Sequence, residues 1–257
     1  MTTQTERPAT PVARILVIGY GVLAYALFLG AFVYTMGFLA NVGVPRGIDD
    51  GPTAPLAVAI VVNSALLGLF AVQHSVMARP WFKRAWTRII PPSMERSTYV
   101  LAATLILILL LWQWRAMPDT VWSVGIGWVA ALLFVLYAFG WLLVVGSTFA
   151  IDHFDLFGLR QVAARARSRA YDGPGFRQPL LYRLVRHPIM VGFIIAFWAA
   201  PDMSTGRLLF AVLGTAYIIV AVRFEEHDLR KLHGADYDRY AARVPRFVPG
   251  TARAARG

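Results

Sequence analysis

The chain has 257 residues, of which 58% are hydrophobic and only 15% charged, whereas soluble proteins average about 45–50% apolar and about 25% charged residues. Its long apolar runs exclude disordered, collagen-like and nucleic-acid-binding proteins. The net charge is +11, and we interpret the basic residues beside the apolar runs as groups that interact with anionic lipid. The lack of cysteine excludes disulfides, thiolate metal sites and cysteine nucleophiles.

Six apolar runs predict an all-α, polytopic transmembrane protein with about six membrane segments. They cover residues 12–40, 54–78, 98–114, 121–150, 188–200 and 207–222. The fifth run is shorter than the roughly 20 helical residues that cross a bilayer core. We therefore expect it to begin earlier, to tilt, or to form a helical hairpin with the sixth.

Basic residues divide unevenly between the loops. Of the 25 lysines and arginines, 22 lie in the N-terminal segment, in residues 79–96, in residues 160–186 and from residue 223 onward. The other three, Arg46, Arg115 and Arg207, lie in the alternate loops. By the positive-inside rule both termini are cytoplasmic, which requires an even number of crossings and supports six.

The C-terminal region is predicted to extend beyond the membrane as helices. The sixth helix is expected to continue to His233 and to stop at Gly234. A short helix over residues 236–243 would follow, with Asp236 as its N-cap and Pro245 beyond its end.

Ionisable residues are costly near hydrocarbon and are therefore informative. Here they gather at the predicted cytoplasmic ends of the segments, and their convergence predicts a shared pocket for a small molecule. The residues are His74, His153, Asp155, Arg186, His187, Glu225 and Glu226. The competing interpretation is that the ends of membrane segments simply meet water.

Three residues are predicted to line a path for an apolar substrate. Asn63 lies eleven positions before His74, about three helical turns, and so shares its face. Trp141 and Ser147 lie on the fourth segment and lead towards His153. A packed or interfacial residue is the alternative for His74, and an interfacial turn with helix-capping side chains is the alternative for the stretch after Ser147.

Two further elements suggest ligand binding. Pro188 suits the first turn of a helix, and that free N-terminus together with Arg186 favours an anionic group such as a carboxylate; a basic membrane-flanking stretch is the alternative. Glu225 and Glu226 directly follow an apolar run and could bind a ribose diol or a cationic ligand. Salt bridges to neighbouring arginines are the competing explanation.

Other site classes find no support in the sequence. The five histidines lack zinc or di-iron spacing, so no metal is predicted. There is no dinucleotide fingerprint, P-loop or nucleophile elbow.

The motifs nevertheless match a known superfamily. Arg186-His187-Pro188 with Gly192, then the glutamate pair, and then two tyrosines resemble the integral-membrane methyltransferases related to isoprenylcysteine carboxyl methyltransferase, over roughly the last hundred residues. Within that superfamily, residues 73–79, 95–99 and 153–161 are similar to bacterial methanethiol S-methyltransferases and NnrU-type proteins.

This resemblance implies S-adenosylmethionine as the methyl donor, with S-adenosylhomocysteine as its product, bound on the cytoplasmic side of a bacterial inner membrane. It implies a single membrane domain over 1–257, with a substrate part (1–152) and a cofactor part (153–257). The implied cofactor contacts are Gln161, Tyr182, Arg186, His187, Pro188, Met190, Glu225, Glu226, Tyr237 and Tyr240. Many relatives have tyrosine where Met190 stands, which puts an aromatic contact at that position in doubt.

The implied reaction converts methanethiol to dimethyl sulfide. A small thiol is largely protonated at neutral pH, so a positioned base or a nearby positive charge must generate the thiolate. His74 and His153 are the candidates, with Asp155 orienting. Two alternatives remain open: the same fold acting on a prenylated thiol or carboxylate, and an NnrU-like non-enzymatic membrane protein. Lipid is the expected surrounding partner, nucleic acid is not expected, and no oligomeric state is predicted.

Overall fold

The computed structural model describes residues 10–173, 175 and 178–251, which fold mainly into helices. The chain divides into two compact units that alternate along the sequence. The predicted division between residues 152 and 153 concerned function and stays a prediction.

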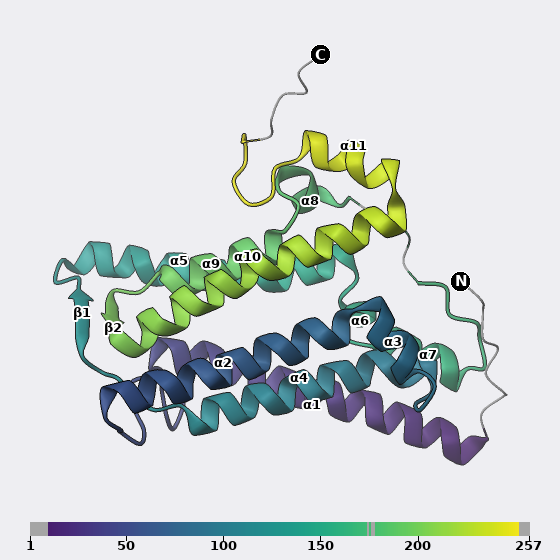
Figure 1. Cartoon of the computed structure of the whole chain (residues 1–257), viewed down its shortest axis with the longest axis horizontal. Coiled ribbons are helices and arrows are strands. Elements are labelled where there is room, and N and C mark those ends of the chain that lie inside the picture. Colours follow the sequence, from purple (N-terminus) through teal and green to yellow (C-terminus); the bar gives the residue numbers. More distant parts are fainter. Residues whose placement is uncertain (1–9, 174, 176–177, 252–257) are drawn as a thin grey trace. The chain divides into compact units, whose positions relative to one another are not determined.

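The first unit comprises Met1–Met36, Gly68–Gln113 and Asp152–Gly175. It holds most of helix α1 and the second half of α2, both of which continue into the second unit, and four further helices (Figure 1). The bounds are α1 Pro11–Ala40, α2 Leu56–Ala78, α3 Pro80–Trp86, α4 Pro92–Gln113, α6 His153–Leu156 and α7 Leu159–Ala166.

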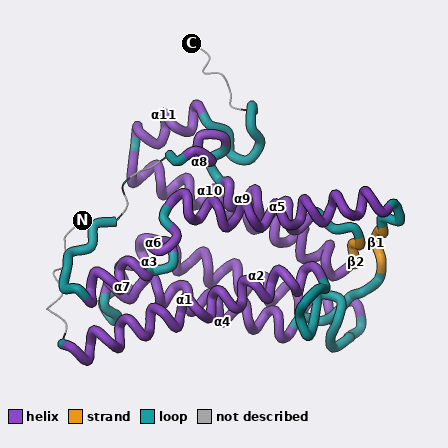
Figure 2. The backbone as a smooth tube through the Cα atoms, turned by 180° about the vertical axis from the view of Figure 1, so that it is seen from behind, coloured by secondary structure: helices purple, strands orange, loops and turns teal. Residues whose placement is uncertain are grey.

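The second unit comprises Gly37–Leu67, Trp114–Ile151 and Phe176–Gly257. Its helices are α5 Gly127–Ile151, α8 Leu180–Leu184, α9 Pro188–Trp198, α10 Thr205–His233 and α11 Ala235–Arg243, and its strands are β1 Thr120–Ser123 and β2 Asp202–Ser204. The two strands lie at one end of α10, and α8 and α11 lie at the other (Figure 2).

Among the described residues, five helices are long and apolar enough to cross a membrane: α1, α2, α4, α5 and α10. Helix α9 has 11 residues, so it is about 16 Å long and cannot cross a hydrocarbon core of about 30 Å by itself. It is followed directly by β2 and α10 and packs against α10 as the predicted hairpin.

The strands show how the short helix fits into the crossing pattern. Strand β2 pairs antiparallel with β1, with Met203 opposite Trp122. Strand β1 precedes α5 and strand β2 follows α9. Their pairing therefore brings the end of α9 back to the level at which α5 begins. The predicted helical fold of about six segments is therefore confirmed, with extended residues completing the fifth.

Close backbone packing positions α9 against α5. A Cβ atom on Gly140 would lie 2.7 Å from the carbonyl oxygen of Gly192, and one on Gly192 would lie 2.6 Å from that of Gly140. Small residues at a helix crossing allow this approach in membranes. The crossing holds the N-terminus of α9, and with it His187, at a defined height on α5.

Contacts between α1, α4 and α6 hold the first unit together. The Tyr20 hydroxyl donates to Thr98 Oγ1 at 2.8 Å, and Arg96 Nε donates to the Leu156 carbonyl at 2.8 Å. The second contact ties the short helix α6 to α4. As a result, His153 at the start of α6 has a defined place in the unit.

Element boundaries differ from the prediction at several points. The fourth segment begins at Gly127 rather than 121 because residues 120–123 form β1, and the third begins earlier, at Pro92. Helix α10 ends at His233 as predicted, with Gly234 at a positive φ of 51°. Gly234 also occupies the N-cap position of α11, so the prediction of Asp236 as N-cap is wrong: a residue with no side-chain constraint makes the sharp turn between the two helices.

Candidate functional site

The two adjacent glutamates near the end of α10 point in different directions. Successive residues of an α-helix point about 100° apart, so only one of the pair can face α9. Glu226 is that residue, with a fully buried side chain, whereas the side chain of Glu225 is 47% exposed. Glu226 lies about 21 residues after the start of α10, or about 32 Å along its axis, which is close to one membrane thickness.

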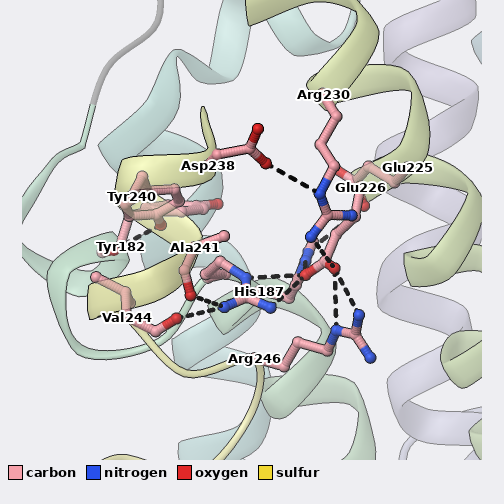
Figure 3. Close-up of polar contacts among 11 residues, drawn as sticks. Tyr182, His187, Glu225, Glu226, Arg230, Asp238, Tyr240, Ala241, Val244 and Arg246 are labelled. Carbon is pink, nitrogen blue, oxygen red and sulfur yellow. Dashed lines mark hydrogen bonds and ion pairs between the residues drawn. The ribbon is translucent and has the colours of Figure 1, made fainter. Parts of the chain in front are cut away.

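The Glu226 carboxylate is surrounded by cations (Figure 3). Its Oε1 accepts from Nε and Nη2 of Arg186, both at 2.8 Å, and lies 3.2 Å from His187 Nε2. Its Oε2 accepts from Nε and Nη2 of Arg246, at 3.0 and 2.7 Å. A buried charge is tolerated only with such complete pairing, and hydrogen bonds between charged groups are stronger than those between neutral ones. We call these four residues the Glu226 cluster.

Arg186 links the Glu226 cluster to the C-terminal helix. Its Nη1 donates to the Ala241 carbonyl at 2.9 Å and also to the Val244 carbonyl, at the C-terminal end of α11. Its backbone N–H donates to the Pro245 carbonyl at 2.8 Å, and that of His187 donates to the Arg246 carbonyl at 3.2 Å. Four of the five guanidinium N–H groups are thus engaged, and the segment after α11 is tied to the residues before α9.

His187 connects the buried glutamate with the exposed one. Its Nδ1 lies 3.5 Å from Glu225 Oε2, and its Nε2 faces Glu226. Burial alone lowers the pKa of His187, but the hydrogen bonds and charges of the two carboxylates outweigh burial and raise the pKa above its usual value. The imidazole is therefore held towards its cationic form.

The N-terminus of α9 is available to an anionic group. His187 is the N-cap of α9, and its side chain does not cap the helix; Pro188 occupies the first turn, as predicted. Helix N-termini with uncapped N–H groups attract carboxylates and phosphates. Protonation of His187, which its raised pKa favours, strengthens this attraction at the same place.

The predicted cofactor tyrosines form the core of the C-terminal cap. Tyr237, Tyr240 and Val244 are buried against one another, and the Tyr240 hydroxyl donates to the Tyr182 carbonyl at 2.6 Å, joining α11 to α8. Burial raises the pKa of Tyr240 to about 12 and also raises the pKa values of Tyr182 and Tyr237. All three hydroxyls are therefore protonated at neutral pH, and their contact with a cofactor stays a prediction.

The candidate base His153 lies in the first unit. Its Nε2 is 2.7 Å from the Tyr25 hydroxyl, and burial lowers its pKa. The Asp152 carboxylate accepts from the Asp155 N–H at 3.2 Å, which caps α6, and pairs with Arg160 at 2.9 Å. His153 is thus held neutral at neutral pH on a capped helix turn.

Asp155 and Gln161 are also in contact in the first unit. Gln161 Nε2 donates to Asp155 Oδ1 at 3.1 Å, and the Tyr171 hydroxyl bonds the same oxygen. The expected orientation of His153 by Asp155, and the contact of Gln161 with a cofactor, stay predictions.

The second candidate base, His74, has a similar tyrosine partner. Its Nε2 lies 2.8 Å from the Tyr99 hydroxyl, and its ring stacks on Phe70 at 5.2 Å between centroids.

The three predicted substrate residues all lie in the second unit, in its interior. The Asn63 amide holds the loop after α4, because its Nδ2 donates to the Arg115 carbonyl at 2.8 Å and its Oδ1 accepts from the Arg115 N–H at 2.9 Å. Ser147 Oγ donates to the Leu143 carbonyl at 2.6 Å, within its own helix. Trp141 packs edge-on against Tyr137 and Phe193. Each of the three residues thus makes contacts that support the fold. Contact of these residues with substrate stays a prediction.

The structure therefore gathers the predicted site residues into two groups. Arg186, His187, Glu225 and Glu226 meet in the second unit, and His74, His153, Asp155 and Gln161 belong to the first. A single shared pocket stays a prediction. Among the described residues, no cluster of three or more histidine, aspartate or glutamate side chains could hold a metal ion.

Several contributing residues were missed by the sequence analysis. Arg246 completes the pairing of Glu226, and the only sequence signal was a basic residue directly after Pro245. Tyr25 lies in the middle of an apolar run, where a tyrosine hydroxyl needs a partner. Asp152 could have been found from its place three residues before Asp155, where it caps α6.

Comparisons with known proteins agree on one family. The NnrU protein family model matches residues 64–227. The chain is 52% identical to methanethiol S-methyltransferase 2 of Bradyrhizobium diazoefficiens (92% of this chain, 91% of the relative) and 53% identical to methanethiol S-methyltransferase of Mycobacterium tuberculosis (92% and 97%). It is 35% identical to Nurim of Rattus norvegicus over 65% of this chain and 66% of that protein. No solved structure matches.

Proposed function

The chain belongs to the NnrU family, and on this premise we propose that it is a membrane-embedded methyltransferase that methylates methanethiol, with S-adenosylmethionine as donor. The products would be dimethyl sulfide and S-adenosylhomocysteine. The single observation that carries the proposal is the similarity to methanethiol S-methyltransferases over nine-tenths of both chains. We further propose that the protein lies in a bacterial inner membrane with both termini cytoplasmic, since 22 of its 25 basic residues are in the loops assigned to that side.

The polar groups around α9 have the chemistry that this donor requires. S-adenosylmethionine carries a carboxylate, an amino group, a ribose diol and an electrophilic methyl group on a sulfonium, which it supplies when bound. The uncapped N-terminus of α9, next to His187 with its raised pKa, suits the carboxylate. The half-exposed Glu225 carboxylate suits the ribose hydroxyls or the amino group. The donor set therefore fits the cofactor.

The buried and exposed glutamates take different roles in this proposal. All hydrogen-bonding directions of Glu226 are used by Arg186, His187 and Arg246, so we assign Glu226 to positioning His187 and the start of α9. Glu225 is the carboxylate that we assign to the cofactor. Contacts from Tyr182, Met190, Tyr237 and Tyr240 of the same unit complete the proposed set.

The protein must also generate a thiolate. Free thiols ionise only near or above pH 8.5, and methyl transfer needs the thiolate sulfur in line with the methyl group. We assign the base role to His153, with His74 as the alternative, because burial keeps His153 unprotonated at neutral pH. Apolar walls such as the rings around Trp141 would suit a substrate that partitions into the membrane.

The test measures dimethyl sulfide in the headspace over membranes that contain the protein, methanethiol and isotopically labelled S-adenosylmethionine. Labelled product is expected from the wild type, and Glu225→Gln should weaken binding of S-adenosylhomocysteine. Asp236→Asn is the matched control, because Asp236 is an exposed acid paired with Arg239 on α11. Wild-type membranes that bind the donor but release no product would show that the acceptor is wrong; membranes that do not bind it would refute the methyltransferase proposal.

A further inference from the structure

The candidate base His153 is hydrogen-bonded to a tyrosine hydroxyl, that of Tyr25. Tyr25 Oη and His153 Nε2 are 2.7 Å apart, which is a short hydrogen bond. The two residues come from α1 and α6, 128 positions apart in the chain. His153 is only 7% exposed, whereas Tyr25 is half-buried. Tyr25 is therefore the more exposed residue of the pair.

Aromatic rings surround this pair. The rings of Phe154 and Phe157 lie 5.5 and 4.8 Å from that of His153, between centroids, and Phe157 stacks on Phe28 at 4.2 Å. Sulfur atoms make favourable contacts with aromatic rings. The rings also supply apolar surroundings next to the Tyr25 hydroxyl, which would suit a small thiol.

We propose that Tyr25 is a catalytic residue that accepts the proton of the thiol substrate and passes its own proton to His153. The inference deepens the proposed function and rests on it. As the S–H bond breaks, its proton forms a bond with Tyr25 Oη, while the hydroxyl proton moves to His153 Nε2. The sulfur keeps the electron pair as a thiolate, tyrosine stays neutral, and the imidazolium later loses its proton to water.

The hydrogen-bond chemistry supports this direction of transfer. A tyrosine hydroxyl both donates and accepts, so it can receive one proton while it gives up another. His153 accepts at Nε2 as the neutral tautomer with its proton on Nδ1, and the proposal requires this tautomer. Burial lowers the pKa of His153 and so favours the neutral form. A thiol approaching Nε2 directly would have to displace Tyr25, because that nitrogen already lies within 2.7 Å of the hydroxyl.

The other tyrosine–histidine pair is less suited to the task. The Tyr99 hydroxyl lies 2.8 Å from His74 Nε2 but also 3.4 Å from the carbonyl of the same histidine. Tyr99 is 9% exposed, and the Arg96 guanidinium lies 5.5 Å from the centre of its ring. Its hydroxyl is thus held inside the unit, which favours a structural role for this pair.

The experiment compares three single tyrosine-to-phenylalanine variants of the full chain in membranes. Tyr25→Phe tests the proposal and Tyr99→Phe tests the other pair. Tyr20→Phe is the matched control, because Tyr20 lies on the same helix and also loses one hydrogen bond, to Thr98 at 2.8 Å. Turnover, KM for methanethiol and binding of S-adenosylhomocysteine are measured for each variant.

Tyr25→Phe should lower kcat by about 10²–10⁴-fold, the usual range for a positioned proton-transfer group, with unchanged binding of S-adenosylhomocysteine. Tyr20→Phe and Tyr99→Phe should keep kcat within a few-fold of the wild type. The defect of Tyr25→Phe should shrink when thiophenol, a more acidic thiol, replaces methanethiol, because less help with ionisation is then needed. A structural defect would not depend on the acidity of the thiol.

The double variant Tyr25→Phe/His153→Gln provides a second test. If both residues carry one proton, the double variant should be no slower than the slower single variant. Equal turnover in Tyr25→Phe and Tyr20→Phe, or a thiophenol defect as large as the methanethiol defect, would overturn the inference while leaving the proposed function intact. Wild-type membranes that methylate no thiol would overturn both.

Discussion

The Glu226 cluster leads to a quantitative prediction for Glu226→Gln. The substitution keeps the shape of the side chain but removes its charge, and it leaves the Arg186 and Arg246 guanidinium groups without a counter-ion at that position. The side chain of Arg186 is only 9% exposed, whereas that of Arg246 is 43% exposed. Removing one partner of a buried ion pair costs about 3–5 kcal/mol. We expect the loss to come mainly from Arg186, because water can screen Arg246.

The matched control is Asp236→Asn, which breaks the pair of Asp236 with Arg239 on α11. Both side chains of that pair are 68% exposed, and exposed pairs contribute about 0–1 kcal/mol. Thermal unfolding in lipid nanodiscs without cofactor should show a large decrease in Tm for Glu226→Gln and little change for Asp236→Asn. Limited proteolysis should release the α11 region of Glu226→Gln first. Equal Tm values for the two variants would refute the assignment of Glu226 as a structural centre.

Three further predictions concern stability. The pKa of His187 is raised in the folded state. Its contribution to folding stability is therefore fully present below its unfolded pKa of about 6.5 and is lost as pH rises through the folded value. The Tm difference between the wild type and His187→Gln should shrink above neutral pH. Gly192→Ala should destabilise the protein by about 1–3 kcal/mol, because its Cβ would meet backbone at 2.6 Å, whereas Gly146→Ala, with open space around it, should leave Tm unchanged. Asn63→Ala leaves two backbone groups unpaired and should cost about 1–3 kcal/mol for each one that stays buried, measured by the same thermal unfolding.

Much of the fold could be predicted from the sequence because apolar length and charge are properties of single segments. The runs of the long helices and the stop of α10 at Gly234 follow from local composition and backbone freedom. The early start of the third segment at Pro92 and the strand at 120–123 depend on neighbours that a single segment does not reveal. Strand β1 forms because β2, about 80 residues later, offers it a partner.

The candidate site was less predictable for a similar reason. The sequence indicated that Glu225 and Glu226 mattered, and it left open whether they bind a ligand or form salt bridges. The choice depends on which of two adjacent helix positions faces α9, and a segment boundary uncertain by a few residues cannot decide it. Arg246 was missed because its pairing with Glu226 requires the chain after α11 to fold back against the backbone of His187.

The arrangement explains why α10 extends so far beyond its apolar part. The overrun of α10 places Glu226 beyond the apolar part of the helix, and the chain turns back after α11 so that the guanidinium groups of Arg186 and Arg246 meet the same carboxylate. Both oxygens of Glu226 are occupied, and His187 lies between this buried carboxylate and the exposed one of Glu225. Under the proposed function, the C-terminal segment therefore supports the site, and Glu225 is the carboxylate that we assign to the cofactor.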